Sequence, residues 1–277
     1  MDESLRTYLD FAVETAYLAG RLTLGYFQSG VRSDLKPDDT PVTVADRQAE
    51  ELIRGRITAR WPGHAVVGEE YGVAGAADAT HRWFIDPIDG TKAFIRGVPL
   101  YAVLIGLEIA GRVEVGAAYF PALDEMIAGA TGQGAWWNGR PARVSEVADL
   151  GRAYVAFTDP ASFAAHGRAA AWARLQAASY HRAGWSDAYG YLLVATGRVE
   201  VMLDPVMDPW DCGPFPPILR EAGGYFGDWA GNETIHADEA LATTRTLLPQ
   251  VLRLIEGDRI QPHPCEGFKP SQGFDQR

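Results

Sequence analysis

The sequence predicts an α+β (mixed α/β) protein built as a layered sandwich of helices and sheets. Two amphipathic helical segments occupy the first 60 residues, a meander of antiparallel strands follows, and strand and helix alternate from Ala153 onward. The chain has 277 residues, of which 47% are apolar. This is enough for one large domain, or for two modest halves that share a core.

The first two helices are predicted from their apolar spacing and their caps. In MDESLRTYLDFAVETAYLAG, apolar residues recur at three- and four-residue steps and Ser4 can cap the N-terminus. Acids near its start and the lack of a long apolar run argue against a signal peptide. The second helix runs from about Val44 to Arg60, buries Ile53 and Ile57, and ends at Pro62-Gly63. The predicted buried face of the first helix is Leu5, Tyr8, Leu9, Ala12, Ala16 and Ala19.

The middle of the chain reads as a series of strands. AVVGEEYG is a short apolar run that ends in two acids, and YAVLIGLEIAGRVEVGAAYF reads as two strands joined at Ala110-Gly111. DEMIAGA and GAWWNGRPARVS are predicted as further strands, with Asn138-Gly139 as a hairpin turn.

The second half alternates AYVAF (strand), ASFAAHGRAAAWARLQAA (helix), VEVMLD (strand), DCGPFPPILREAG (helix) and GGYFGDW (strand). We therefore expect an N-terminal α+β half at residues 1–150 and a C-terminal α/β half at residues 151–256. No linker separates them, so they should share one body. The tail at residues 257–277 contains three prolines and little periodicity, which predicts a loosely ordered extension.

The charge balance limits the partners that the protein can have. Lys and Arg number 25 against 36 Asp and Glu, a formal charge of −11, which argues against nucleic-acid and anionic-membrane surfaces. No stretch approaches the ~20 apolar residues of a membrane span. An anionic substrate would then need metal cations or helix N-termini at its site. The cysteines, Cys212 and Cys265, match no zinc or disulfide spacing, which predicts a reduced, cytoplasmic protein.

Acids follow apolar runs at three separate places. Glu69 and Glu70 end one run, Asp86 and Asp89 end another, and Asp211 opens a helix. Acids placed after strands lie at a sheet edge, where open α/β sheets usually bind ligands. Gathered carboxylates favour hard divalent cations, Mg²⁺ in particular.

The stretch DPIDGT carries the most chemistry. Pro87 keeps Asp86 out of the helical region, and the turn PIDG brings Asp89 back beside it. Gly90 and Thr91 begin the next element, where backbone N–H groups can hold phosphate oxygens. Taken alone, DPIDG is an ordinary turn, GEE a solvated charge pair and WD an N-cap. Their joint presence in this order favours a site for metal ions and phosphate.

These motifs, GEE, DPIDGT and WD followed by EAGG, resemble the inositol monophosphatase superfamily of Mg²⁺-dependent, lithium-sensitive phosphomonoesterases. The resemblance covers roughly residues 5–256, and its central signature is WFIDPIDGTKAFIRGVP. It implies a layered αβαβα sandwich, a homodimer, a small-molecule phosphate ester as substrate, and two or three Mg²⁺ ions per site.

The resemblance also implies roles for individual residues. Gly90 and Thr91 match the phosphate-binding turn. Asp46 matches the acid that pairs with the Thr91 hydroxyl to orient the attacking water, with Thr43 in support; alone, Asp46 would be an ordinary first-turn helix acid. The matching metal ligands are the side chains of Glu69, Asp86, Asp89 and Asp211 and the backbone carbonyl of Ile88.

The implied mechanism is hydrolysis by a metal-activated water, without a phosphoenzyme. Glu69, Asp86 and the Ile88 carbonyl hold the ion that lowers the pKa of the water, so Glu69 joins Thr91 and Asp46 as a catalytic residue. A second ion, held by the three aspartates, stabilises the leaving alkoxide.

The segment HRAGWSDAYGYLLVATG, residues 181–197, is similar to histidinol-phosphate phosphatases of the same superfamily. These place an aspartate just before a helix and a tyrosine four residues on, and Asp187 and Tyr191 keep that spacing. Ser186 stands where a glycine is usual. Because histidinol phosphate carries an ammonium group and an imidazole ring, Asp187 could pair with the first and an aromatic side chain, Trp185 or Tyr189, could cover the second. The predicted substrate contacts are Asp89, Trp185, Asp187, Tyr191 and Asp204.

Several alternatives stay open from the sequence. Ser186 and Asp187 could simply cap the helix. The substrate could be inositol-1-phosphate or another sugar or nucleotide phosphate, although no basic cluster suggests fructose-1,6-bisphosphate. From another class, the chain could bind metal and ligand without turnover. In the tail, His263 and Cys265 form at most half a metal site.

Overall fold

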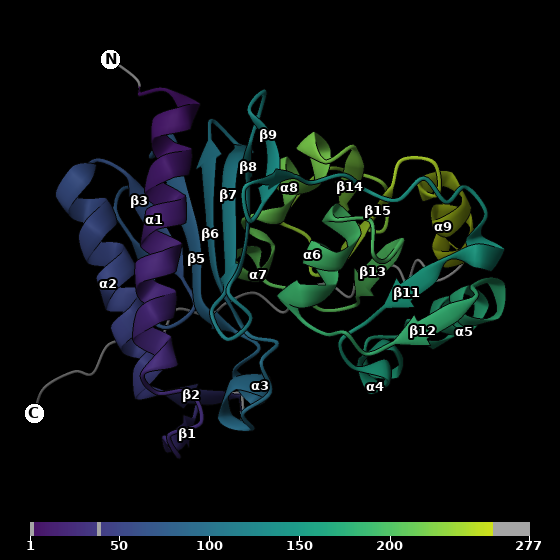
Figure 1. Ribbon diagram of the computed structural model, residues 1–277, viewed down its shortest axis with the longest axis horizontal. Helices are drawn as coiled ribbons and strands as arrows, with labels where there is room; N and C mark the ends of the chain where they lie inside the picture. Colours follow the sequence, from purple (N-terminus) through teal and green to yellow (C-terminus); the bar gives the residue numbers. More distant parts are fainter. Residues whose placement is uncertain (1–2, 38–39, 257–277) are drawn as a thin grey trace, which may run out of the picture.

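The computed structural model describes residues 3–37 and 40–256, so the predictions made for the tail lie outside the described residues. Helices and sheets stack in five layers, helix–sheet–helix–sheet–helix (Figure 1). The predicted layered αβαβα sandwich is confirmed. In the described ranges, no helix is long and apolar enough to cross a bilayer.

The first layer consists of α1 (Leu5–Leu24) and α2 (Val44–Arg60). The Ser4 hydroxyl caps α1 by accepting a hydrogen bond from the Thr7 N–H, and Thr43 caps α2. Small residues let α1 approach the sheet closely: a Cβ on Gly20 would lie 2.4 Å from the Tyr119 ring. The predicted bounds of α2 are confirmed, and so is the predicted face of α1, with Leu5 only partly buried.

The second layer is an eight-stranded sheet of order β10-β9-β8-β7-β6-β5-β3-β4. Neighbouring strands are antiparallel, except that β3 and β5 run parallel. Ala110-Gly111 and Asn138-Gly139 make the two predicted tight turns, with positive φ at all four residues. The strands are β3 (Ala65–Gly68), β4 (Gly72–Ala74), β5 (His81–Asp89), β6 (Ala102–Ile109), β7 (Arg112–Phe120), β8 (Glu125–Ala130), β9 (Gly134–Trp137) and β10 (Arg140–Pro141), and a separate pair is formed by β1 (Ser33–Leu35) and β2 (Pro41–Thr43).

The fourth layer is a five-stranded sheet of order β12-β11-β13-β15-β14. Between the sheets lie α6 (Ala188–Ala195), α7 (Pro209–Cys212) and α8 (Phe215–Glu221), and α8 contacts both sheets. The outer layer holds α4 (Pro160–Ala165), α5 (Ala169–Ala178) and α9 (Leu248–Ile255). The strands are β11 (Tyr154–Ala156), β12 (His181–Ala183), β13 (Val201–Asp204), β14 (Gly224–Gly227) and β15 (Ala240–Thr244), and the remaining short elements are α3 (Thr91–Ile95) and a 3₁₀ turn at Leu150–Arg152.

The segment between α7 and α8 lies directly on the large sheet. Gly106 of β6 and Gly116 of β7 face each other in register, and a Cβ on either would lie 2.2 or 2.0 Å from the backbone of Gly213 or Pro214. Only glycines allow this approach. It brings the start of α7, with Asp211, over the end of β5.

Two predicted helices are each divided in two. The first breaks at Gly167, whose positive φ ends α4 before α5 begins, and the second is divided into α7 and α8. The strands β1, β2, β12 and β15 and the helix α9 were not predicted. The boundary between two halves at residue 150 stays a prediction.

Candidate active site

A cleft of about 640 Å³ opens between the two sheets, at the C-terminal ends of β5 and β13. The start of α3 and the start of α7 complete its walls. Most of its polar groups are carboxylates. Its lining residues include Lys36, Glu69, Asp86, Ile88, Asp89, Gly90, Thr91, Lys92, Thr158, Asp159, Ser162, Asp187, Asp204, Met207, Asp208, Trp210 and Asp211.

Asp86 and Asp89 reach the same side of β5 because the strand is irregular between them. Asp86 pairs with Leu104 and Asp89 with Ala102, so three steps on β5 oppose two steps on β6. In a regular strand, side chains three residues apart point to opposite faces, and the extra residue removes this alternation. The Ile88 N–H also donates to Asp86 Oδ1 at 2.9 Å, which fixes that carboxylate.

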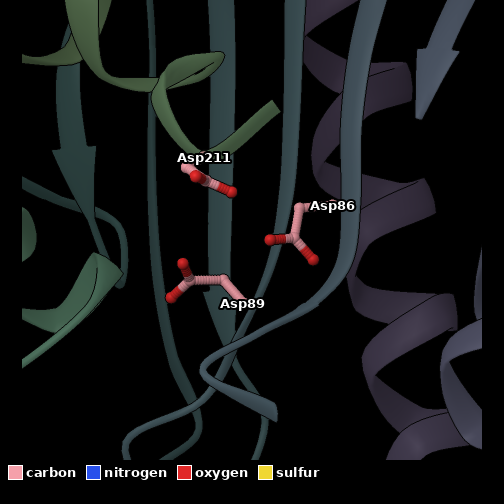
Figure 2. Close-up of side chains that lie close together, drawn as sticks. All are labelled: Asp86, Asp89 and Asp211. Atoms are coloured by element: carbon pink, nitrogen blue, oxygen red, sulfur yellow. The ribbon is translucent and has the colours of Figure 1, made fainter. Parts of the chain in front are cut away.

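Asp211 approaches the same space from α7. Its Oδ2 accepts a hydrogen bond from the Asp208 N–H at 2.9 Å, as part of a capping box. One oxygen each of Asp86, Asp89 and Asp211 lies within 4.8 Å of the other two. Figure 2 shows the three carboxyl groups around one space, two from the strand and one from the helix.

The electrostatics of this cluster favour a bound cation. Burial, followed by the charges of neighbouring carboxylates, raises the pKa values of Asp86 and Asp89 well above their usual range. Burial also raises the pKa of Asp211, to about 8. A divalent cation among the three would offset both causes, and hard oxygen donors in this number suit Mg²⁺. The residues present therefore fit the predicted ion.

Glu69, the fourth predicted acid, lies in the turn between β3 and β4. Its Oε1 accepts a hydrogen bond from Lys36 Nζ at 2.7 Å, and the same ammonium lies 2.7 Å from Glu70 Oε1. Burial alone would lower the pKa of Lys36, but the hydrogen bonds to both glutamates outweigh it and raise that pKa. The Lys36 ammonium is therefore the cation that lies beside Glu69 in this structure.

The Thr91 hydroxyl lies between two oxygens beneath the cleft. Its Oγ1 donates to the Ile88 carbonyl at 3.0 Å and lies 3.4 Å from Asp46 Oδ1. Asp46 is fully buried on α2, and its other oxygen accepts from both the N–H and the hydroxyl of Thr43, at 2.8 and 2.6 Å. Burial raises the pKa of Asp46 and the Thr43 hydrogen bonds oppose the shift. The arrangement connects the cleft to a buried proton acceptor.

Asp187 lies at the opposite wall, directly before α6. Its φ of 54° is in the left-handed region, which is unusual for a residue other than glycine. A Cβ on Gly90 would lie 3.1 Å from Asp187 Oδ2, so Gly90 lets the two walls approach. Burial raises the Asp187 pKa, and Ser186 and Lys92 oppose the shift. Asp187 is the N-cap residue of α6 but makes no side-chain capping hydrogen bond to it, which argues against a role as a simple helix cap.

Asp204 ends β13 and also faces the cleft. It accepts hydrogen bonds from the Tyr191 hydroxyl at 2.9 Å and from the Thr158 N–H at 3.3 Å, and burial raises its pKa to about 6. Tyr191 is fully buried behind Asp204 and does not line the cleft. Trp185 does not line it either: the residue is 37% exposed, and its ring centroid lies 6.4 Å from that of His181.

The structure therefore brings the predicted acids, Thr91 and Asp46 together, and leaves two predicted substrate contacts, Trp185 and Tyr191, outside the cleft. The sequence prediction missed Lys36 and Lys92. The sequence offered only the scarcity of lysine as a signal, since the chain contains three lysines among its 25 basic residues, and no local pattern places two of them in the cleft. It also missed further lining residues, namely Thr158, Asp159, Ser162, Met207, Asp208 and Trp210.

The layered fold and the carboxylate cleft are those of a metal-dependent phosphatase, and the chain belongs to the inositol monophosphatase family, whose model matches residues 4–258. It is a phosphoric monoester hydrolase. A solved structure from Bartonella henselae, the extragenic suppressor protein suhB, has the same fold. It superposes with a TM-score of 0.83 at 27% identity, over 90% of this chain and 98% of that one. An inositol monophosphatase from Anabaena gives a TM-score of 0.79 at 29% identity, over 92% and 97%.

Similar proteins of assigned function indicate which branch of the family this chain resembles. A histidinol-phosphatase of Chlorobaculum parvum is 43% identical over 247 residues, which cover 87% of this chain and 93% of that protein. A histidinol-phosphatase of Mycobacterium tuberculosis is 38% identical over 228 residues, or 80% and 87% of the two chains. The predicted similarity to the histidinol-phosphate phosphatase branch is thereby confirmed.

Proposed function

We propose that the protein is a Mg²⁺-dependent phosphatase that hydrolyses L-histidinol phosphate to L-histidinol. The observation that carries the choice of substrate is the position of Asp187, a buried carboxylate in the cleft wall beside the Gly90 turn. A negative group so close to the ester position suits an alcohol that carries an ammonium group better than a neutral polyol. The identities to two histidinol-phosphatases support the same choice.

The metal ligands in this proposal are those predicted from the sequence. Asp86, Asp89, Asp211, Glu69 and the Ile88 carbonyl would together hold two or three Mg²⁺ ions. When bound, Mg²⁺ would lower the pKa of the attacking water and offset the negative charge of the phosphate and of the leaving oxygen. The shared orientation of the three aspartates around one space supports these roles (Figure 2).

The proton of the attacking water would leave through Thr91 and Asp46. Thr91 Oγ1 can accept a hydrogen bond from the water while its own proton turns toward Asp46 Oδ1, which is 3.4 Å away. Thr43 holds the second Asp46 oxygen, so the acceptor cannot rotate out of line. Gly90 and Thr91 would hold the phosphate through the turn that begins α3.

Asp187, Asp204 and Asp89 would bind the alcohol part of the ester. In this arrangement Tyr191 acts through Asp204, whose carboxylate it orients, and makes no contact with substrate. The cleft-lining tryptophan is Trp210, and we propose that Trp210, in place of Trp185, covers the imidazole ring.

The test is phosphate release with Mg²⁺ from histidinol phosphate, inositol-1-phosphate, fructose-1,6-bisphosphate and adenosine 3′,5′-bisphosphate, compared side by side. The proposal expects the highest kcat/KM on histidinol phosphate. A higher kcat/KM on inositol-1-phosphate would favour the second candidate, an inositol-phosphate phosphatase, for which the Asp204 carboxylate is a suitable hydroxyl acceptor. The absence of release from all four esters would favour a binding protein without turnover.

We further propose a homodimer that acts in the cytoplasm. Tyr154, Tyr180 and Trp185 are exposed around β12, which is an edge strand among the described residues, and an edge strand can pair with another chain. Cys212 is buried as a free thiol, which suits a reducing compartment. Sedimentation equilibrium tests the dimer, and a monomer at micromolar concentration would contradict it.

A further inference from the structure

The turn that carries Glu69 rests on a buried carboxylate. Gly68 pairs with Gly72 across β3 and β4, so Glu69, Glu70 and Tyr71 form the turn between them. Glu50 of α2 is fully buried beneath it. Glu50 Oε2 accepts from the Glu70 N–H at 2.8 Å, and Oε1 accepts from the Tyr71 N–H at 3.1 Å. Both donors are the backbone amides that directly follow Glu69.

Arg54, one helical turn further along α2, completes the contact. Its Nε donates to Glu50 Oε1 at 2.7 Å, and its Nη2 donates to the Gly72 carbonyl at the end of the turn. Burying a carboxylate is costly even when it is paired, and apolar side chains often replace buried ion pairs without loss of stability. The charge at position 50 is therefore better explained by the turn that it holds than by the stability of the helix.

The turn and the helix fit only because a glycine lies between them. A Cβ on Gly68 would lie 2.3 Å from Glu50 Oε1 and 2.7 Å from Arg54 Nη2. Asp46, which faces Thr91, lies four residues before Glu50 and thus on the same face of α2. One helix face supports both the Thr91–Asp46 pair and the Glu69 turn.

We propose that Glu50 is a positioning residue of the metal site: it fixes the turn that presents Glu69 and thereby sets the affinity for Mg²⁺. The inference rests on the proposed function, because it assumes that Glu69 is a ligand. Glu50 does not touch the ion in this arrangement and acts through the backbone of the turn.

The test is calorimetric titration of the full chain with Mg²⁺. Glu50→Gln keeps the shape of the side chain but removes its charge, and we expect the Kd for Mg²⁺ to rise about 10- to 100-fold, the usual effect of losing a partner of a metal ligand. Saturating Mg²⁺ should restore most of the lost phosphatase activity. The matched control is Glu14→Gln, which breaks a 2.6 Å ion pair with Arg56 of the same helix away from the turn, and it should leave the Kd unchanged.

A second variant perturbs the same contact from the other side. Gly68→Ala should displace the Glu50 carboxylate and weaken Mg²⁺ binding, whereas Gly55→Ala, on α2 with nothing beyond its own helix backbone within 4 Å of the added Cβ, should not. In the wild type, hydrogen exchange at the Glu70 and Tyr71 amides should be slow. Wild-type affinity in both Glu50→Gln and Gly68→Ala, or fast exchange at the two amides, would overturn the inference. A wild type that binds no Mg²⁺ would instead sink the proposed function and the inference with it.

Discussion

Replacing Asp211 by asparagine should stabilise the metal-free protein. The variant removes one ionisable group from the aspartate cluster, while an asparagine oxygen can still accept the hydrogen bond from the Asp208 N–H. Burial, and then the charges of nearby acids such as Glu69, raise the pKa of Asp211 to about 8. At pH 7 the folded state therefore holds a proton that the unfolded state, with a pKa of 3.8, has released.

The size of the effect follows from this difference in pKa. Between pH 3.8 and pH 7 the folded state loses about 1.4 kcal/mol per pH unit relative to the unfolded state, about 4 kcal/mol in all. Water that reaches the half-buried carboxyl reduces this to about 2–3 kcal/mol. For a chain of this length that corresponds to a rise in Tm of roughly 5–10 °C. Because Asp211 takes up a proton on folding between its two pKa values, the advantage of the variant should vanish toward pH 4 and reach its full size near pH 8.

Mg²⁺ should reverse the order of stability. At a concentration of 1,000 Kd, the ion stabilises the wild type by about 4.1 kcal/mol, which exceeds the advantage of the variant, and the variant, which lacks one ligand, should gain little. The assay is thermal unfolding from pH 4 to pH 8, in a chelator and in saturating Mg²⁺, with the exposed Asp78→Asn as control. A metal-free variant no more stable than the wild type at pH 7, or a full Mg²⁺ shift in the variant, would refute the reasoning.

Three further predictions address the proton path, the substrate and the fold. Thr91→Val keeps the side-chain shape but removes the hydroxyl, so kcat should fall by about 100- to 1,000-fold while calorimetry finds unchanged Mg²⁺ affinity; normal turnover would remove Thr91 from the mechanism. Asp187→Asn should raise KM for histidinol phosphate about tenfold or more and leave inositol-1-phosphate nearly unaffected, because only the first carries an ammonium group; equal losses in steady-state kinetics would make Asp187 a structural residue. The free energy of unfolding should fall as pH drops from about 6.5 toward 4, because burial and then the nearby His81 lower the pKa of His64 to about 4, so the unfolded state takes up a proton that the folded state refuses. The His64 Nδ1 accepts a hydrogen bond from the Trp83 indole at 3.1 Å, and His64→Asn retains an acceptor there. In urea unfolding, the free energy of unfolding of this variant should depend less on pH than that of the wild type. An identical pH dependence would contradict the role given to His64.

The layers and the metal cluster could be predicted because each rests on a local signal. Ala110-Gly111 and Asn138-Gly139 form the predicted two-residue turns, with the positive φ angles that such hairpin turns require. The proximity of Asp86 and Asp89 was predicted, but the predicted turn at PIDG was wrong, because the strand continues through Asp89 and an extra residue in it brings the two carboxylates to one side. The break at Gly167 was missed because an isolated glycine in a helical pattern does not by itself end the helix.

The substrate wall was harder to predict because its geometry depends on packing between segments far apart in the chain. The resemblance to histidinol-phosphate phosphatases placed Tyr191 with Asp187 as a substrate contact, yet Tyr191 is directed into the core, where it meets Asp204 thirteen residues later. Lys36 reaches Glu69 across 33 residues, and no local pattern encodes that contact. The same limit hid Glu50, whose role is visible only when α2 and the Glu69 turn are seen together.

The most direct test of the account is hydrolysis of histidinol phosphate with Mg²⁺ in ¹⁸O-labelled water. The account predicts one labelled oxygen in the phosphate, none in the released alcohol, no reaction in a chelator, and almost no reaction in Asp89→Asn. Label in the alcohol, or the same rate without metal, would contradict the claim that the carboxylate cluster directs a metal-activated water to phosphorus.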